Sequence, residues 1–326
     1  MSLSRQVQAN GLRFHIRELG TGPLVLLCHG WPELSWSWRH QMEPLAAAGF
    51  RVVAPDLRGF GDTDAPAEID AYTMLHSVGD MVGLVQALGE STAVIVGHDW
   101  GAQLAWTASL MRPEVFRAVA GLSVPYTPRG HMSMLDVARK HGLDGFYMLY
   151  FQKAGVAEAV LERDPHDSLL RLIYSASGDI PSRRQGWPFI VPEGRTILDV
   201  CPRPERELPW LPESDLRVYS DAYARSGFRG GLNWYRCIDL TWRLTAAWAG
   251  ARIRVPSLFI GGERDAVLRM PGLVDAVKEL PRNLPGLQHS EIIPNVGHWI
   301  QQEAPERVTR LLLQFLRSLP TVNRQQ

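Results

Sequence analysis

The sequence predicts an α/β protein in which a mostly parallel central sheet is flanked by helices and interrupted by a long insertion. Short apolar runs recur along the chain and are separated by stretches of helical length, a pattern typical of buried parallel strands. Between the fourth and fifth runs lies a long stretch of different composition, so the sheet is expected to be interrupted there. The runs cover residues 23–28, 52–55, 93–96, 118–124, 256–261 and 291–294.

Two antiparallel edge strands are expected before the first run. Residues 4–20 alternate loosely in polarity and break at Asn10-Gly11, a pair that favours tight hairpin turns. Helices are expected between and after the runs. These segments include 74–88, 272–280 and 305–319.

The insertion covers residues 126–250 and divides an α/β core into a first part, 1–125, and a second part, 251–326. It has few long apolar runs, many aromatic residues and a proline-rich stretch at 191–212. An unstructured loop of this length would be improbable, so we expect a mostly helical cap. In open α/β sheets the site lies at the carboxyl ends of the strands, where a cap would cover it and exclude water. No motif fixes the path of residues 180–215.

Composition narrows the classes of partner. The chain has 326 residues, of which 34 are basic and 34 acidic, and no basic cluster occurs that would bind nucleic acid or an anionic membrane. No signal peptide or membrane span is expected. The three cysteines, Cys28, Cys201 and Cys237, are scattered and lack metal-binding spacing, which favours a reducing cytoplasm.

The most informative motif is Gly97-His-Asp-Trp-Gly101, directly after the third apolar run. A strand that turns sharply into a helix between two glycines holds its central side chain exposed, and here that side chain is Asp99 rather than serine. A carboxylate attacks best at a saturated carbon and becomes an ester itself. Asp99 therefore indicates displacement of an alkyl leaving group. An ordinary strand-to-turn segment is the alternative interpretation.

A carboxylate nucleophile needs a base that later drives water onto the ester. His298 follows the last apolar run and Asp265 follows the run before it, with Glu263 as the rival acid. This chain order of nucleophile, acid and histidine is that of α/β-hydrolases. Asp265 would hold His298 in the required tautomer and stabilise its imidazolium.

Several motifs together resemble the soluble and microbial epoxide hydrolases of the α/β-hydrolase fold. They are His29-Gly-Trp-Pro-Glu, Gly97-His-Asp-Trp-Gly, Glu263-Arg-Asp-Ala-Val-Leu and Gly297-His-Trp, with further similarity at Trp38-Arg-His-Gln and Asp56-Leu-Arg-Gly-Phe-Gly. The resemblance implies a pair of cap tyrosines that bind the epoxide oxygen, matched here by Tyr147 and Tyr235, with Tyr150 as the rival of Tyr147. A phenol, with a pKa of about 10, is protonated at neutral pH and can donate to that oxygen.

Two backbone N–H groups, those of Trp31 and Trp100, are expected to form an oxyanion hole. They would act when water attacks the ester carbonyl of Asp99, because the first displacement develops no tetrahedral oxyanion. His29 and His98 are expected to be structural, since the residue next to the nucleophile points to the other face of its strand.

The resemblance implies hydrolysis of an apolar epoxide to a vicinal diol, with no metal and no organic cofactor. The expected partner is the small-molecule substrate, and a homodimer is possible. The alternatives are a haloalkane dehalogenase, in which the indole N–H groups of Trp31 and Trp100 would bind halide, and a non-catalytic small-molecule binding protein on the same fold. By resemblance, the residues expected to contact substrate are Trp31, Pro32, Trp100, Met148, Val267 and Trp299.

Overall fold

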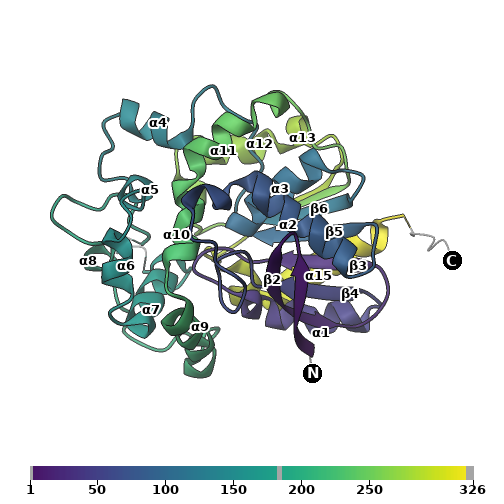
Figure 1. The fold of residues 1–326 in the computed structure, drawn as a ribbon, viewed down its shortest axis with the longest axis horizontal. Coiled ribbons are helices and arrows are strands. Elements are labelled where there is room, and N and C mark those ends of the chain that lie inside the picture. The colour runs from purple at the N-terminus through teal and green to yellow at the C-terminus, as the bar shows by residue number, and fades with distance from the viewer. Residues whose placement is uncertain (1–2, 182–185, 321–326) are drawn as a thin grey trace.

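The computed structural model describes residues 3–181 and 186–320, and its centre is an eight-stranded sheet with the order β1-β2-β4-β3-β5-β6-β7-β8 (Figure 1). β1 and β2 are antiparallel to their neighbours, whereas the strands from β4 to β8 run parallel. The α/β prediction is therefore confirmed. The strands are β1 Leu3–Ala9, β2 Leu12–Leu19, β3 Leu24–Cys28, β4 Arg51–Pro55, β5 Ala93–His98, β6 Phe116–Leu122, β7 Ser257–Gly262 and β8 Leu287–Ile293.

The first two strands form the expected hairpin. Asn10 and Gly11 connect them with φ angles of 49° and 76°, the left-handed region that asparagine and glycine tolerate best. The alternation in residues 4–20 is that of a strand with one face toward the core.

Helices cover both faces of the sheet. Those of the core are α1 Arg39–Ala47, α2 Met74–Ala87, α3 Trp100–Met111, α12 Leu273–Lys278, α13 Leu280–Asn283, α14 Ile300–Glu303 and α15 Pro305–Ser318. Short 3₁₀ helices are η1 Ser35–Trp38, η2 Ile69–Tyr72, η3 Ala246–Trp248 and η4 Val267–Arg269. α2 and α3 pack with one apolar cluster, and α1 and α15 pack with a second cluster on the opposite face.

The parallel strands are buried on both faces, which explains why they appear in the sequence as unbroken apolar runs. In β5, Ala93 and Ile95 belong to the first cluster, whereas Val94 and Val96 belong to the second. This alternation is the two-residue period of a strand with helices on each side.

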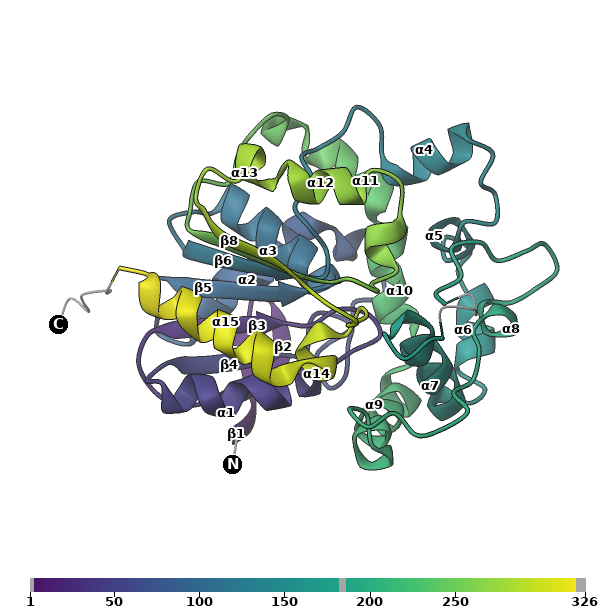
Figure 2. The ribbon, with the colours of Figure 1, turned by 180° about the vertical axis from the view of Figure 1, so that it is seen from behind.

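Among the described residues, eight α-helices and the 3₁₀ helix η3 lie between β6 and β7 in the chain. Figure 2 shows α4 to α9 together on one side of the sheet, with α10 between them and the core. In α7, Asp164 accepts a hydrogen bond from the backbone N–H of Asp167 and Pro165 is the first helical residue, two features that favour a helix start. The eight are α4 Met134–Lys140, α5 Tyr147–Tyr150, α6 Val156–Leu161, α7 Pro165–Ala176, α8 Ile197–Val200, α9 Glu213–Ser226, α10 Arg229–Arg236 and α11 Ile238–Leu244.

Most predicted boundaries lie within two residues of those in the structure, but two elements differ more. β8 begins at Leu287 rather than 291, because it is an edge strand whose residues 288–290 are exposed and polar. The helix expected at 272–280 is divided into α12 and α13, since Pro281 has no N–H to continue a helix. Within the part of the chain that the structure describes, no helix is long and apolar enough to cross a membrane.

Candidate active site

Asp99 occupies a sharp turn between β5 and α3. Its φ and ψ angles are 52° and −117°, a conformation that a non-glycine residue rarely adopts. The flanking glycines are required by contact: a Cβ on Gly97 would lie 1.9 Å from the carbonyl oxygen of Gly101, and a Cβ on Gly101 would lie 2.2 Å from that of Cys28. The turn holds the carboxylate at the carboxyl end of the sheet, where open α/β proteins bind ligands.

The two oxygens of Asp99 have different neighbours. The backbone N–H of Trp31 donates to Oδ1 over 2.9 Å, and Nε2 of His298 lies 3.4 Å from Oδ2. Burial alone would raise the pKa of Asp99, but the hydrogen bond and charge of His298 and the N–H of Trp31 bring it below its ordinary value. The carboxylate is therefore ionised, as a nucleophile must be.

His298 and Asp265 form a pair. Nδ1 of His298 lies 3.0 Å from both oxygens of Asp265, which also accepts the backbone N–H of Val267 at 2.8 Å. Burial lowers the pKa of His298, yet Asp265 and Asp99 together raise it well above its ordinary value. Because Nδ1 faces Asp265, Nε2 faces Asp99. The rival acid, Glu263, is exposed and accepts the backbone N–H of Asn295 instead.

Tyr147 and Tyr235 line the same two cavities as Asp99. Their ring centroids are 6.1 Å apart, and the two side chains are almost fully buried. Burial and the charge of Asp99 raise the pKa of each phenol, so both hydroxyls are protonated over the physiological pH range. Tyr150, the rival of Tyr147, lines neither of the two cavities at this site.

Two cavities meet at Asp99. One has a volume of about 30 Å³ and contains the carboxylates of Asp99 and Asp265 and the ring of His298 in its wall. The other, of about 550 Å³, runs from Asp99 between α3, α4 and α11 to half-exposed side chains that include Met132 and Met134. Both tyrosines line both cavities, so the phenols lie where the two spaces join.

The residues expected to contact substrate are divided between these spaces. Trp31 and Trp299 line the small cavity, Trp100 and Met148 line the large one, and Val267 lines both. Pro32 lines neither.

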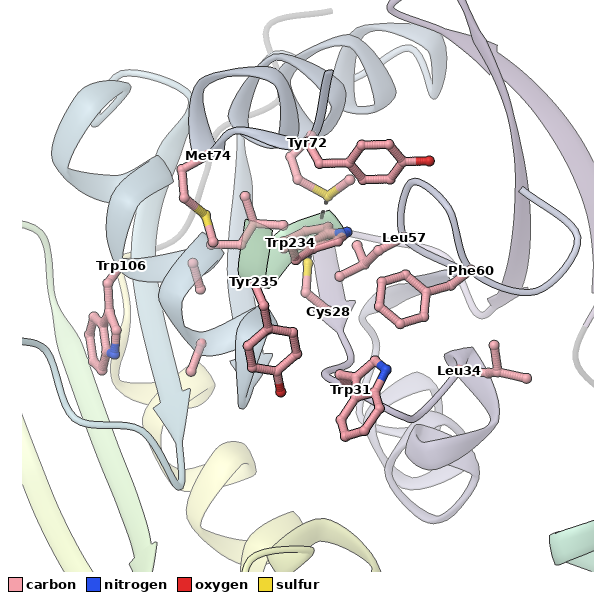
Figure 3. Close-up of a cluster of buried hydrophobic side chains, with 14 of the residues drawn as sticks. Cys28, Trp31, Leu34, Leu57, Phe60, Tyr72, Met74, Trp106, Trp234 and Tyr235 are labelled. Carbon is pink, nitrogen blue, oxygen red and sulfur yellow. Dashed lines mark hydrogen bonds between the residues drawn. The ribbon is translucent and has the colours of Figure 1, made fainter. Parts of the chain in front are cut away.

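Figure 3 shows the edge of the apolar cluster that faces this site. Tyr235 directs its hydroxyl away from the cluster, whereas the indole nitrogen of Trp31 is directed toward Phe60. A Cβ on Gly231 would lie 3.0 Å from that nitrogen, which is buried and has no hydrogen-bond partner among the described residues. The indole N–H of Trp31 therefore faces α10 and not Asp99. Trp100 is the first residue of α3, so its backbone N–H is one of the helix donors that have no acceptor within the helix.

Sequence reasoning missed several polar and aromatic neighbours of the site. Nδ1 of His98 lies 2.7 Å from Oε2 of Glu33, and Nε2 of His98 lies 2.8 Å from the carbonyl oxygen of His298. Glu33 belongs to a motif described above, but its partners are distant in sequence and no local pattern marks them. Trp187 and Met270 also line the small cavity. Trp187 belongs to the stretch 180–215, whose path no motif fixes.

Neither His29 nor His98 lines a cavity. His29 accepts the backbone N–H of Leu57 through Nε2 and is completely buried. Among residues 3–181 and 186–320, no group of three or more histidine, cysteine or acidic side chains is arranged to hold a metal ion.

Comparison with known proteins agrees with this geometry. The α/β-hydrolase fold family matches residues 23–305. An epoxide hydrolase of Caballeronia sordidicola is 41% identical over 318 residues, covering 97% of this chain and 94% of that protein. Epoxide hydrolase A of Mycobacterium tuberculosis is 41% identical over 320 residues, covering 97% of each.

The solved structures agree as well. That of an epoxide hydrolase from an endophytic Streptomyces superposes with a TM-score of 0.93 at 47% identity, covering 97% of this chain and 95% of that one. The chain therefore belongs to the epoxide hydrolases of the α/β-hydrolase fold family.

Proposed function

We propose that this enzyme converts an apolar epoxide and water to a vicinal diol through an alkyl ester on Asp99. In the first step Asp99 forms a bond to one epoxide carbon, the carbon–oxygen bond breaks, and the released oxygen takes a proton from Tyr147 or Tyr235. An alkoxide is a poor leaving group, so epoxide opening needs such a donor. The ionised carboxylate opposite two protonated phenols, with a cavity between them, carries the proposal.

In the second step water attacks the ester carbonyl. His298, oriented by Asp265, takes the proton of the water, and the negative charge that develops on oxygen is stabilised by the backbone N–H groups of Trp31 and Trp100. Oδ1 of Asp99, which accepts the N–H of Trp31, becomes that carbonyl oxygen. Collapse of the intermediate breaks the bond to the alkyl oxygen, which takes the proton from His298, and the diol leaves. The proton that remains on the new Asp99 carboxyl replaces the one that the phenol gave up in the first step, so the ionised carboxylate and both protonated phenols are restored.

Oxygen labelling tests the covalent route. In single turnover in heavy-oxygen water, the label should enter the Asp99 carboxylate before it enters diol, because the first diol takes its second oxygen from the enzyme. Mass spectrometry of the peptide that contains Asp99 and of the diol measures both. His298→Gln should let the ester accumulate, and Asp99→Ala should form none. Label that goes directly into first-turnover diol, or near-native diol formation by Asp99→Ala, would exclude the mechanism.

A haloalkane dehalogenase is the competing function. Halide needs N–H donors and no acid, and the indole N–H of Trp31 faces Gly231 rather than Asp99. The double variant Tyr147→Phe/Tyr235→Phe separates the two functions. We expect it to lose at least about a hundredfold in the rate of ester formation from an epoxide, since general acids contribute about 10²–10⁴-fold. Substantial bromide release from a bromoalkane that is unchanged in the double variant would instead support dehalogenation.

The large cavity favours an epoxide with an extended apolar substituent. Its wall combines aromatic and aliphatic side chains from α3, α4 and α11, and it opens beside half-exposed methionines. We propose that residues 126–250 act as the cap over this space. A panel of terminal, aryl and internal epoxides, scored for diol with halide release measured alongside, tests the substrate class.

Location and assembly complete the proposal. The three cysteines are free and buried, in agreement with a reducing cytoplasm. We propose that the enzyme assembles as a homodimer, which sedimentation equilibrium would test.

A further inference from the structure

One carboxylate joins the loop of His298 to the cap. Glu303, the last residue of α14, accepts the backbone N–H groups of Gly297 and Gly178 through Oε2, each over 2.9 Å. Its Oε1 accepts the N–H of Trp299 over 3.0 Å. Gly297 and Trp299 flank His298, whereas Gly178 follows α7 in the insertion. Glu303 therefore contacts both sides of the histidine and the cap at once.

The junction around Glu303 is tightly packed. The backbone N–H of His298 itself donates to the carbonyl oxygen of Ala176 over 2.9 Å. A Cβ on Gly297 would lie 2.1 Å from the nitrogen of Gly178, and a Cβ on Gly178 would lie 2.6 Å from the carbonyl oxygen of Asn295. Neither glycine can be enlarged without moving the two segments apart.

Within the described residues, the hydrogen bonds that Glu303 accepts all come from backbone N–H groups. No arginine or lysine within residues 3–181 and 186–320 forms an ion pair with it. Burial raises its pKa to about 7, against the three backbone donors, which lower it. If this position needed only a side chain of the right size, an uncharged residue would fill it equally well. A carboxylate, in contrast, can accept all three N–H groups.

We propose that Glu303 is a positioning residue for ester hydrolysis, which fixes the His298 loop against the cap segment 176–178. The inference rests on the proposed two-step function. Nε2 of His298 must lie within hydrogen-bond reach of the attacking water, and displacement of a catalytic group by about 1 Å can cost about a hundredfold in rate. His298 transfers no proton during attack by Asp99, so the first step depends much less on its exact position.

Glu303→Gln tests this role. The amide retains the size of the side chain but replaces one acceptor oxygen with an NH₂ group, which cannot accept a backbone N–H. Stopped-flow tryptophan fluorescence and rapid-quench mass spectrometry with styrene oxide, at about pH 9 where Glu303 is ionised, measure the two steps separately. We expect ester hydrolysis to slow by roughly ten- to a hundredfold and ester formation to change less than about twofold, so that the ester accumulates.

Two further variants complete the experiment. Glu263→Gln is the matched control, because this exposed glutamate accepts the N–H of Asn295 in the same loop, and it should change neither step. Gly178→Ala disturbs the junction from the cap side, because its Cβ would lie 2.6 Å from the carbonyl oxygen of Asn295 and 2.9 Å from Oε2 of Glu303, and it should also slow hydrolysis selectively.

The outcomes separate this inference from the proposed function. Equal slowing of both steps, or no slowing, in Glu303→Gln and Gly178→Ala would overturn the positioning role. Failure of the wild-type enzyme to form any ester would instead overturn the two-step function.

Discussion

Asp99 and His298 each shift the pKa of the other toward its charged form. In the free enzyme His298 lowers the pKa of Asp99, while Asp99 and Asp265 raise that of His298. In the proposed mechanism, formation of the ester would remove the charge of Asp99 and with it one of the groups that keep His298 protonated. The pKa of His298 would then fall, so the imidazole could give up its proton and act as the base for attack by water.

This coupling predicts a pH effect in His298→Gln. Attack requires the ionised carboxylate, and in the wild type the lowered pKa of Asp99 keeps ester formation constant into the acidic range. Without His298, burial raises the pKa of Asp99, so ester formation should begin to fall at a higher pH than in the wild type. Rapid-quench measurement of ester formation against pH checks this. The exposed His289→Gln is the control, and coincident acid limbs in wild type and His298→Gln would contradict the coupling.

The sequence is informative about residues that belong to a local motif. Asp99 is marked by its two glycines, and Asp265 and His298 by their positions after consecutive strands. Glu33 lies in such a motif, but its contact with His98 is not marked, and neither is the contact of Glu303 with Gly178, because the two residues of each pair are far apart in the chain. Only the folded arrangement identifies them.

At the scale of elements, the turn between β5 and α3 illustrates how closely a helix approaches the sheet. The α-carbon of Gly101 faces the carbonyl oxygens of Cys28 and His29 at the end of β3. This close approach of α3 to β3 fixes the position of Asp99 relative to the carboxyl ends of the strands.

Gly101→Ala should therefore lower stability. Its Cβ would lie 2.2 Å from a backbone oxygen, so α3 must move, and overpacking of this kind costs about 1–3 kcal/mol. Urea unfolding measures the change in the free energy of unfolding. Gly79→Ala in α2 is the control: its Cβ meets the amide of Asn10, a side chain, at 3.2 Å, and alanine favours a helix. Equal stability of Gly101→Ala and the wild type would contradict the close approach.

The parallel strands β3 to β7 could be predicted because they are buried on both faces, so each forms a continuous apolar run. β8 begins earlier than predicted because an edge strand exposes polar residues. The structure of the insertion was harder to predict. Residues 180–215 contain α8, a helix of four residues, and too few turns for a helical period to be visible. Residues 182–185 of this stretch lie outside the described residues.

At the scale of the whole molecule, the core and the insertion are joined by charged groups away from the site. Nε of Arg39 in α1 lies 2.8 Å from Oδ2 of Asp215 in α9, and Trp36 donates its indole N–H to Oδ1 of the same carboxylate. Arg39 also donates to the carbonyl oxygen of Trp210. These contacts fix α9 to the core.

Asp215→Ala should lower the free energy of unfolding by about 3 kcal/mol, because it leaves the largely buried guanidinium of Arg39 without its anion. Urea denaturation checks this value, with the exposed Asp221→Ala on the same helix as control. If Asp215→Ala and Asp221→Ala had the same free energy of unfolding, the ion pair would not stabilise the contact between the insertion and the core.

The two cavities that share Asp99 suggest separate routes for the substrate and for water. The smaller one, of about 30 Å³, has room for roughly one water molecule beside the base, whereas the larger one extends to the surface. In the proposed cycle a hydrocarbon tail would stay in the larger cavity throughout, while the water that hydrolyses the ester would enter from the smaller one. Lengthening the tail should alter the affinity for substrate far more than the lifetime of the covalent species.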